Sequence, residues 1–128
     1  MVILIGYPAS GKSTYTTTVL KDFKRINRDE LKTMPKCIKE CEKELLNDNS
    51  VVIDNLNHTH KSRKDFIDLA KKHNVWCVGI HINTSFQQAE MWNNQRENKV
   101  PKIVFYTYRK NFENPSLEEG FDELYVII

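Results

Sequence analysis

The residues from Gly6 to Thr14 combine glycine, lysine and hydroxyl side chains at a spacing that can hold phosphate groups. Gly6 and Gly11 are separated by four residues, and Lys12 and Ser13 follow directly, which completes the pattern G-x-x-x-x-G-K-S. In this pattern backbone N–H groups surround the phosphates, the lysine reaches the outer phosphates, and the serine hydroxyl is a ligand of Mg²⁺. The sequence therefore predicts a site for a nucleoside triphosphate and Mg²⁺, with Ser13 as the metal ligand. The residues assigned to this site are Gly6, Pro8, Ala9, Ser10, Gly11, Lys12, Ser13 and Thr14.

The sequence on either side of this loop has the structural context that the pattern needs. The apolar run Val2 to Ile5 precedes the loop as a strand would, and the residues from Lys12 onward are expected to form a helix. A chance match in a glycine-containing turn is the alternative explanation. We disfavour it because two of only four glycines in the chain stand at the required spacing, directly behind the apolar run.

Length and composition indicate one domain, which we expect to span residues 1–128. The chain is 40% hydrophobic and 28% charged, and no apolar run approaches the roughly 20 residues of a membrane-spanning helix. The net charge is only +2, so a nucleic-acid site would have to be a local cluster of cations. Three cysteines, an odd number, favour a reducing, intracellular environment. Cys37 and Cys41 are four residues apart on a predicted helix, where packing is favoured over metal binding.

Strand-like and helix-like segments alternate along the chain without repeats. This alternation predicts an α/β fold of the P-loop NTPase, adenylate-kinase-like type, with a parallel sheet of about five strands and helices on both faces. The expected strands are residues 2–5, 24–27, 51–54, 75–82 and 123–128. The expected helices are residues 12–23, a stretch up to about 47 in which Pro35 starts a new helix, 61–73, one that Thr84 or Ser85 caps and that ends near 94, and one from about 101.

Two polar segments follow predicted strands, at the sheet edge where folds of this type bind their ligands. Asp29 can accept the proton of an attacking hydroxyl in a phosphotransferase, or it can cap the helix that follows. Spacing alone leaves both interpretations open. Asp54 ends the apolar strand 51–54, which is a weak form of the pattern in which an acid holds the water shell of the metal.

Several segments, in order along most of the chain, resemble the 5′-kinase domain of polynucleotide kinase-phosphatase. Only the phosphate loop is decisive by itself, whereas the ordered set of segments is specific. Besides that loop, the segments are Asn27-Arg28-Asp29, Ile53-Asp54-Asn55 with Asn57, Asn93-Asn94-Gln95-Arg96-Glu97, Tyr108-Arg109-Lys110 with Phe112-Glu113, and Pro115 to Phe121. The last of them is more similar to the cellular enzymes than to the phage enzyme.

The resemblance implies that the chain transfers the γ-phosphate of ATP to 5′-hydroxyl ends of DNA or RNA, in nucleic-acid end repair. It assigns three catalytic residues, namely Lys12 of the phosphate loop, Asp29 as the general base, and Arg96. Arg96 lies in the family's lid, where an arginine clamps the ATP phosphates. On composition alone, Arg96 would be a solvated charge at the end of a helix.

The resemblance also assigns residues to the acceptor. Arg28 is similar to a contact with the substrate strand, next to Asp29. Asp54 and Asn55 resemble the acceptor pocket, and for Asp54 the metal-shell role stays open. Arg63 matches an arginine in the helix after this pocket and is assigned as a further contact with nucleic acid.

Departures from the family narrow these expectations. The chain has no Asp-x-Asp-x-Thr signature of the family's phosphatase, so we expect a stand-alone kinase, with any phosphatase or ligase partner on a separate chain. Lys32 stands where the phage enzymes have an arginine, and a lysine meets phosphate only as a point charge. Two other functions share the phosphate loop. A small-molecule kinase needs an enclosed acceptor site, and a non-catalytic ATP-dependent switch needs no acceptor base.

The remaining conspicuous residues have structural interpretations. His58 and His60 form an incomplete metal site, so we expect a solvated loop there. Trp76 lies in a predicted strand and is assigned to the core, whereas Trp92 stays undecided between packing and base stacking. The expected polar face of the helix 61–73 consists of Lys61, Arg63, Lys64, Lys71 and Lys72.

Overall fold

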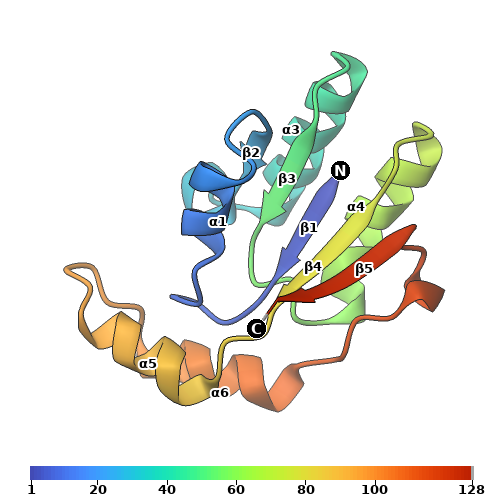
Figure 1. Ribbon diagram of the computed structural model, residues 1–128. Helices are drawn as coiled ribbons and strands as arrows, with labels where there is room; N and C mark the ends of the chain where they lie inside the picture. Colours follow the sequence, from blue (N-terminus) through green and yellow to red (C-terminus); the bar gives the residue numbers. More distant parts are fainter. Residues whose placement is uncertain (128) are drawn as a thin grey trace.

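A computed structural model describes residues 1–127 and shows one sheet of five parallel strands in the order β2-β3-β1-β4-β5 (Figure 1). β1 pairs with β3 on one side and β4 on the other, so the strand before the phosphate loop is the centre of the sheet. The predicted fold class is confirmed. Ile128, the predicted end of the last strand, lies outside the described residues. The strands are β1 (Val2–Ile5), β2 (Lys24–Ile26), β3 (Val51–Asp54), β4 (Val78–Ile82) and β5 (Glu123–Ile127).

Six α-helices and one 3₁₀ turn connect the strands within the described residues. They are α1 (Lys12–Thr18), α2 (Arg28–Leu31), α3 (Met34–Leu46), α4 (His60–Lys72), α5 (Phe86–Asn94), α6 (Lys102–Asn111) and η1 (Leu117–Glu119). The first helix is shorter than predicted because a run of threonines followed by Val19, all β-branched, disfavours its continuation. Pro35 lies in the first turn of α3, as predicted. In residues 1–127 no helix has the length and hydropathy of a membrane span.

The fourth strand begins later than predicted, at Val78. The backbone N–H of Cys77 donates to the side chain of Asp122 at 2.8 Å, and so it does not bond to a neighbouring strand. Trp76 therefore lies before the sheet, where it is 61% exposed and donates from Nε1 to Glu123 at 2.8 Å. The prediction that Trp76 is a core residue is wrong.

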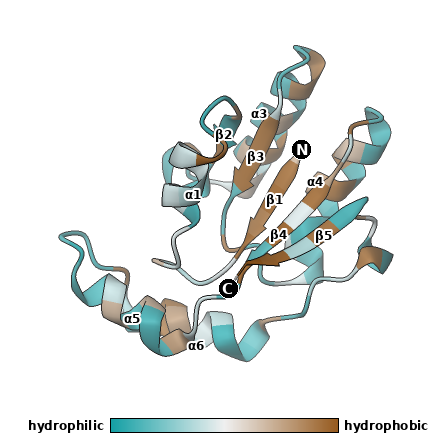
Figure 2. Cartoon of the chain, viewed as in Figure 1, coloured by the Kyte–Doolittle hydropathy of each residue, from teal (hydrophilic) through white to brown (hydrophobic). Residues whose placement is uncertain are grey.

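Helices cover both faces of the sheet, and apolar side chains fill the space between the layers. Figure 2 shows that hydrophobic residues dominate the central strands β1 and β3. α3 and α4 pack on one face, and α1 with the segment after it packs on the other. Cys37 and Cys41 of α3 are fully buried, which confirms the packing interpretation. The larger core, on the α3 and α4 face, includes Ile3, Ile5, Val51, Ile53, Phe66 and Ile67, and the smaller one includes Val2, Leu4, Leu20, Val52, Ile80 and Ile82.

α5 and α6 lie beyond the carboxyl ends of the strands, apart from both helix layers (Figure 1). Aromatic rings join this helix pair to the phosphate loop. The ring centroid of Tyr7 lies 4.1 Å from that of Tyr108, 5.8 Å from that of Phe86 and 6.1 Å from that of Phe105. Aromatic pairs at such distances attract one another beyond the burial of their area. The helix pair is therefore held against the loop that the sequence predicts to bind phosphates.

The segment between α5 and α6 is closed at its base by Asn93. Its amide donates to the backbone C=O of Val100 and accepts from the N–H of the same residue, both at 2.8 Å. Asn93 is only 3% exposed. This pair of bonds, the Asn93 clasp, fixes both ends of the short loop that carries Arg96.

We expect Asn93→Ala to lower the free energy of unfolding by about 1–3 kcal/mol, because it leaves two backbone groups without partners in a partly buried place. Chemical denaturation followed by circular dichroism measures this change. Asn94→Ala is the matched control, since Asn94 is the same residue type and is exposed. Equal effects of the two substitutions would contradict the clasp.

Candidate active site

The phosphate loop leaves β1 and returns into α1 through two residues in the left-handed region. Ala9 has φ 58° and Gly11 has φ 102°. At Gly11 a side chain would strain the backbone, which explains the second glycine of the motif. Left-handed residues alternating with right-handed ones make a concave turn whose N–H groups can bind an anion. This turn leads directly into the N-terminus of α1. The Thr84 hydroxyl donates to the C=O of Ser10 at 2.9 Å and anchors the loop to the end of β4.

Lys12 is buried beneath this loop. Its Nζ donates to the C=O of Gly6 at 2.8 Å and to that of Tyr7 at 2.6 Å. Burial lowers the pKa of Lys12 to about 8, the charges of Asp54 and Asp29 oppose this shift, and that of Arg96 adds to it. Of the residues that the sequence assigns to the site, Asp54, Asp29 and Arg96 therefore influence the charge of Lys12.

Ser13 and Asp54 meet at the start of α1. The Ser13 hydroxyl donates to Oδ2 of Asp54 at 3.3 Å, and Asp54 is only 2% exposed. A hydroxyl and a carboxylate are the oxygen ligands that Mg²⁺ favours, directly or through water. Of the two roles left open for Asp54, this contact favours the metal shell over the acceptor pocket.

Arg25 is a member of the site that sequence reasoning did not single out. Its Nε donates to Oδ2 of Asp54 at 2.7 Å, and its other nitrogens bond to Glu30 and to the Ser13 hydroxyl, the latter at 3.3 Å. Only the pairing of the strands reveals this role of Arg25. β2 pairs with β3 so that Arg25 stands opposite Val52, and its side chain reaches Asp54 at the end of β3. A basic residue in a short strand carries no such signal by itself.

Asn27, and not Asp29, is the N-cap of α2. Its Oδ1 accepts from the backbone N–H of Glu30 at 3.2 Å, and its Nδ2 donates to the backbone C=O of Asp54 at 2.7 Å. The capping interpretation of Asp29 is therefore wrong. Asp29 lies in the first turn and is exposed, and within residues 1–127 its carboxylate makes no hydrogen bond or ion pair.

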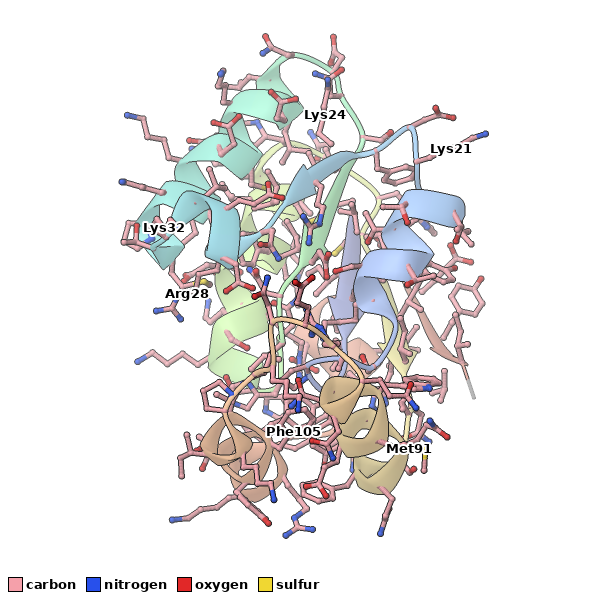
Figure 3. The ribbon with its side chains drawn as sticks, turned by 90° about the vertical axis from the view of Figure 1, so that its left-hand side faces the viewer. Lys21, Lys24, Arg28, Lys32, Met91 and Phe105 are labelled. Carbon is pink, nitrogen blue, oxygen red and sulfur yellow. The ribbon has the colours of Figure 1, made fainter. Side chains whose placement is uncertain are left out.

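Arg28 and Asn55 lie beside this carboxylate. The backbone N–H of Arg28 donates to Oδ1 of Asn55 at 2.8 Å, which joins α2 to the segment after β3. The side chain of Arg28 is exposed, and Figure 3 shows it with Lys32 on the same edge of the molecule, where both project outward. Of the residues assigned to the acceptor, Arg28 and Asp29 are thus exposed, whereas Asn55 is half-buried and Asp54 is buried.

Arg63 does not lie on the surface. It is 0% exposed, and its guanidinium donates to the C=O of Asn57 at 2.7 Å, to the C=O of Glu113 at 2.9 Å and to the carboxylate of Glu119 at 2.9 Å. The predictions that Arg63 contacts nucleic acid and belongs to the polar face of α4 are both wrong, because these partners occupy its donors. Instead, Arg63 positions the turn at Asn57, whose Nδ2 donates to the C=O of Leu4 at 2.7 Å and so binds the end of β1.

The two histidines after β3, His58 and His60, differ in their exposure to solvent. His60 is exposed and pairs with Glu113 at 3.3 Å, but it is the first residue of α4 and so lies in a helix and not in the predicted loop. His58 is half-buried, and its ring lies 5.3 Å from that of Tyr108. Burial lowers the pKa of His58, and the charge of Arg63 adds to the effect. The prediction of a solvated loop is therefore wrong for His58.

The site has the residues that a nucleotide and its cation need. The hydroxyl of Ser10 in the loop is buried without a hydrogen-bond partner among the described residues, as a group kept for a ligand would be. Residues 1–127 contain no cluster of three His, Cys, Asp or Glu that could hold a metal. Mg²⁺ bound with nucleotide phosphates needs only one or two protein oxygens, which Ser13 and Asp54 supply. Arg96 is exposed on the clasped loop between α5 and α6.

The fold and the phosphate loop together define a P-loop kinase. Residues 21–128 match the family described as Chromatin associated protein KTI12, and the chain belongs to this family. The crystal structure of Kti12 from Chaetomium thermophilum in complex with ADP-AlF3 has the same fold, with a TM-score of 0.77 at 13% identity over 98% of this chain and 87% of that chain.

The sequence is also similar to polynucleotide kinases. It is 38% identical over 128 residues to the bifunctional polynucleotide phosphatase/kinase of Schizosaccharomyces pombe, a match that covers 94% of this chain and 31% of that protein. A second relative, from Acanthamoeba polyphaga mimivirus, is 38% identical over 134 residues, with 97% of this chain and 32% of the relative covered. The chain thus spans about a third of the length of these relatives. The resemblance stated from the motifs is confirmed.

We expect Lys12→Met to abolish phosphoryl transfer, by roughly 10²–10⁴-fold or more, because it removes a cation from the transferring phosphate. At about pH 7 the free energy of unfolding should change by less than about 2 kcal/mol, because the loss of a charge that burial disfavours offsets the loss of the donor to the carbonyls of Gly6 and Tyr7. Measurement of transfer, together with urea denaturation, tests both expectations. Lys21→Met, at an exposed lysine, is the control. Undiminished transfer in the folded mutant would place the phosphate site elsewhere.

The same variant tests the lowered pKa. Between the folded pKa of about 8 and the ordinary 10.5, the unfolded chain keeps a proton on Lys12 that the folded chain releases. The folded wild type is therefore stabilised as pH rises through this window, and below it the penalty of the buried charge is complete. We expect wild type to gain stability relative to Lys12→Met between about pH 8 and pH 10.5. A constant difference between the two proteins would contradict the shift.

We expect Arg63→Met to lower the free energy of unfolding by about 3–5 kcal/mol, because it leaves Glu119 and two carbonyls without their buried partner. Lys61→Met, on the exposed face of the same helix, should change it by less than about 0.5 kcal/mol. Thermal and chemical denaturation measure the difference. A direct contact with nucleic acid would give the opposite pattern, with unchanged stability and a reduced salt dependence of oligonucleotide binding.

Proposed function

We propose that residues 1–128 form a polynucleotide 5′-hydroxyl kinase domain, which transfers the γ-phosphate of ATP to 5′-hydroxyl ends of DNA or RNA. The observation that carries the proposal is the state of Asp29. Its carboxylate has no partner among the described residues, because Asn27 caps α2 and Glu30 pairs with Arg25. A carboxylate that is exposed and has no partner among the described residues is suited to act as a base.

The residues take distinct roles in this reaction. The proton of the acceptor hydroxyl passes to a carboxylate oxygen of Asp29 as the hydroxyl oxygen bonds to the γ-phosphorus, and the bond from that phosphorus to ADP breaks. Lys12 and Arg96 stabilise the charge that spreads over the transferring oxygens. Ser13 and Asp54 would hold Mg²⁺, which neutralises charge on the phosphates when it is bound.

The open acceptor side supports a nucleic-acid end over a small alcohol. Asp29 and Arg28 are both exposed, whereas a small-molecule kinase encloses its acceptor. The similarity to the phosphatase/kinase of Schizosaccharomyces pombe supports the same choice. The proposal includes an intracellular role in end repair, alongside phosphatase or ligase activity. The alternative is an ATP-dependent switch without acceptor chemistry, which the match to the KTI12 family leaves open.

The decisive test uses Asp29→Asn. We expect it to bind ATP with wild-type affinity and to lose roughly 10²–10⁴-fold in transfer from labelled ATP to a 5′-hydroxyl oligonucleotide, because asparagine keeps the shape but cannot take a proton. Stability should change by less than about 1 kcal/mol, since the cap is Asn27. Asp22→Asn, at an exposed aspartate outside the site, is the control.

The wild-type protein should be assayed in parallel with 5′-hydroxyl DNA, 5′-hydroxyl RNA and a set of small alcohols. Transfer only to small alcohols would favour the small-molecule kinase. ATP binding without transfer to any acceptor would favour the switch. Retained activity in Asp29→Asn would show that Asp29 is not the base.

A further inference from the structure

Arg25 holds three groups that come from three different elements. Its Nε donates to Oδ2 of Asp54 in β3 at 2.7 Å, one terminal nitrogen donates to the Ser13 hydroxyl in α1 at 3.3 Å, and the other pairs with Glu30 in α2. The side chain of Asp54 is 2% exposed and that of Arg25 is 30% exposed. Asp54 is therefore a buried carboxylate, and the guanidinium of Arg25 that neutralises it is partly exposed to solvent.

The oxygens that Arg25 contacts are the ones a divalent cation would use. Ser13 is the metal ligand that the phosphate-loop pattern predicts, and its hydroxyl already contacts Asp54 at 3.3 Å. A guanidinium and a divalent cation repel each other, and both need the oxygen lone pairs of these two side chains. The two cations therefore cannot share the Ser13–Asp54 pair in the arrangement that the structure shows.

We propose that Arg25 is a built-in counter-cation of this site, which competes with the divalent cation for Ser13 and Asp54. The inference rests on the Mg²⁺ site of the proposed function and adds a mechanism that limits cation binding at this site. Because Arg25 already neutralises Asp54, a divalent cation that binds without nucleotide gains little binding free energy. A cation that arrives with nucleotide phosphates gains further oxygen ligands, so the site accepts the two together.

Glu30 connects the competition between Arg25 and the divalent cation to helix α2. It is the second carboxylate partner of Arg25 and follows Asp29 directly in α2. When a cation takes the Asp54 side of the guanidinium, Arg25 keeps its partner in the helix that carries the proposed base. The occupancy of the cation site is in this way linked to the acceptor side through one side chain.

The test is the binding of Mn²⁺ without nucleotide or acceptor, measured by electron paramagnetic resonance. We expect Arg25→Gln to bind Mn²⁺ about 5- to 150-fold more tightly than wild type, because Asp54 loses its competing partner. The melting temperature of this variant in EDTA should fall by about 5 °C or more, and Mg²⁺ should restore it more than it raises that of wild type. Lys24→Gln, at an exposed lysine next to Arg25 in β2 and outside this ion-pair network, should leave Mn²⁺ affinity unchanged.

A structural role without competition would lower the melting temperature and leave the affinity for Mn²⁺ unchanged, and this result would overturn the proposal. So would a gain in affinity that persists in Arg25→Gln/Asp54→Asn, where the shared carboxylate is absent. If Arg25→Gln does not fold, Arg25→Lys tests the same point, with a smaller gain expected because lysine keeps the charge without the fork. Absence of transfer to oligonucleotides with the expected Mn²⁺ result would overturn the proposed function alone.

Discussion

A single buried carboxylate at the end of β3 fixes the relative positions of the elements around the site. The side chain of Asp54 accepts from Ser13 in α1 and from Arg25 in β2, and its backbone C=O accepts from Asn27, the cap of α2. A buried charge is tolerated only when it is paired and hydrogen-bonded. Displacing these partners from Asp54 would therefore cost much of the stability of the fold. The phosphate loop, the short strand β2 and the acceptor-side helix are thereby assembled around one group.

The second constraint is the packing of α5 and α6 against the phosphate loop. Tyr7 stands inside the loop motif, yet its ring belongs to a cluster with Tyr108, Phe86 and Phe105 from the two helices. The residue between the first glycine and Pro8 thus contributes a packing surface as well as backbone to the loop. Phe105 of α6 is almost completely buried, with its ring close to those of Tyr7 and Phe86.

The sequence predicted the parts of the structure that local rules determine. The phosphate loop, the parallel sheet and the start of α3 at Pro35 follow from motif spacing, alternation and the limits of proline. The roles of charged side chains were harder to predict, because they depend on what faces them. Arg63 has the sequence position of a surface cation, and only the fold brings two carbonyls and Glu119 around it. Arg25 became visible as part of the site only with the pairing of β2 and β3.

The Asn93 clasp has a consequence for how the loop that carries Arg96 can behave. A loop whose ends are tied by two short hydrogen bonds has lost most of its conformational freedom when the protein folds. Ordering an arginine from such a loop around a ligand therefore requires little additional entropy, compared with ordering it from a free strand of chain. The arginine is presented on a small preorganised frame at the end of α5.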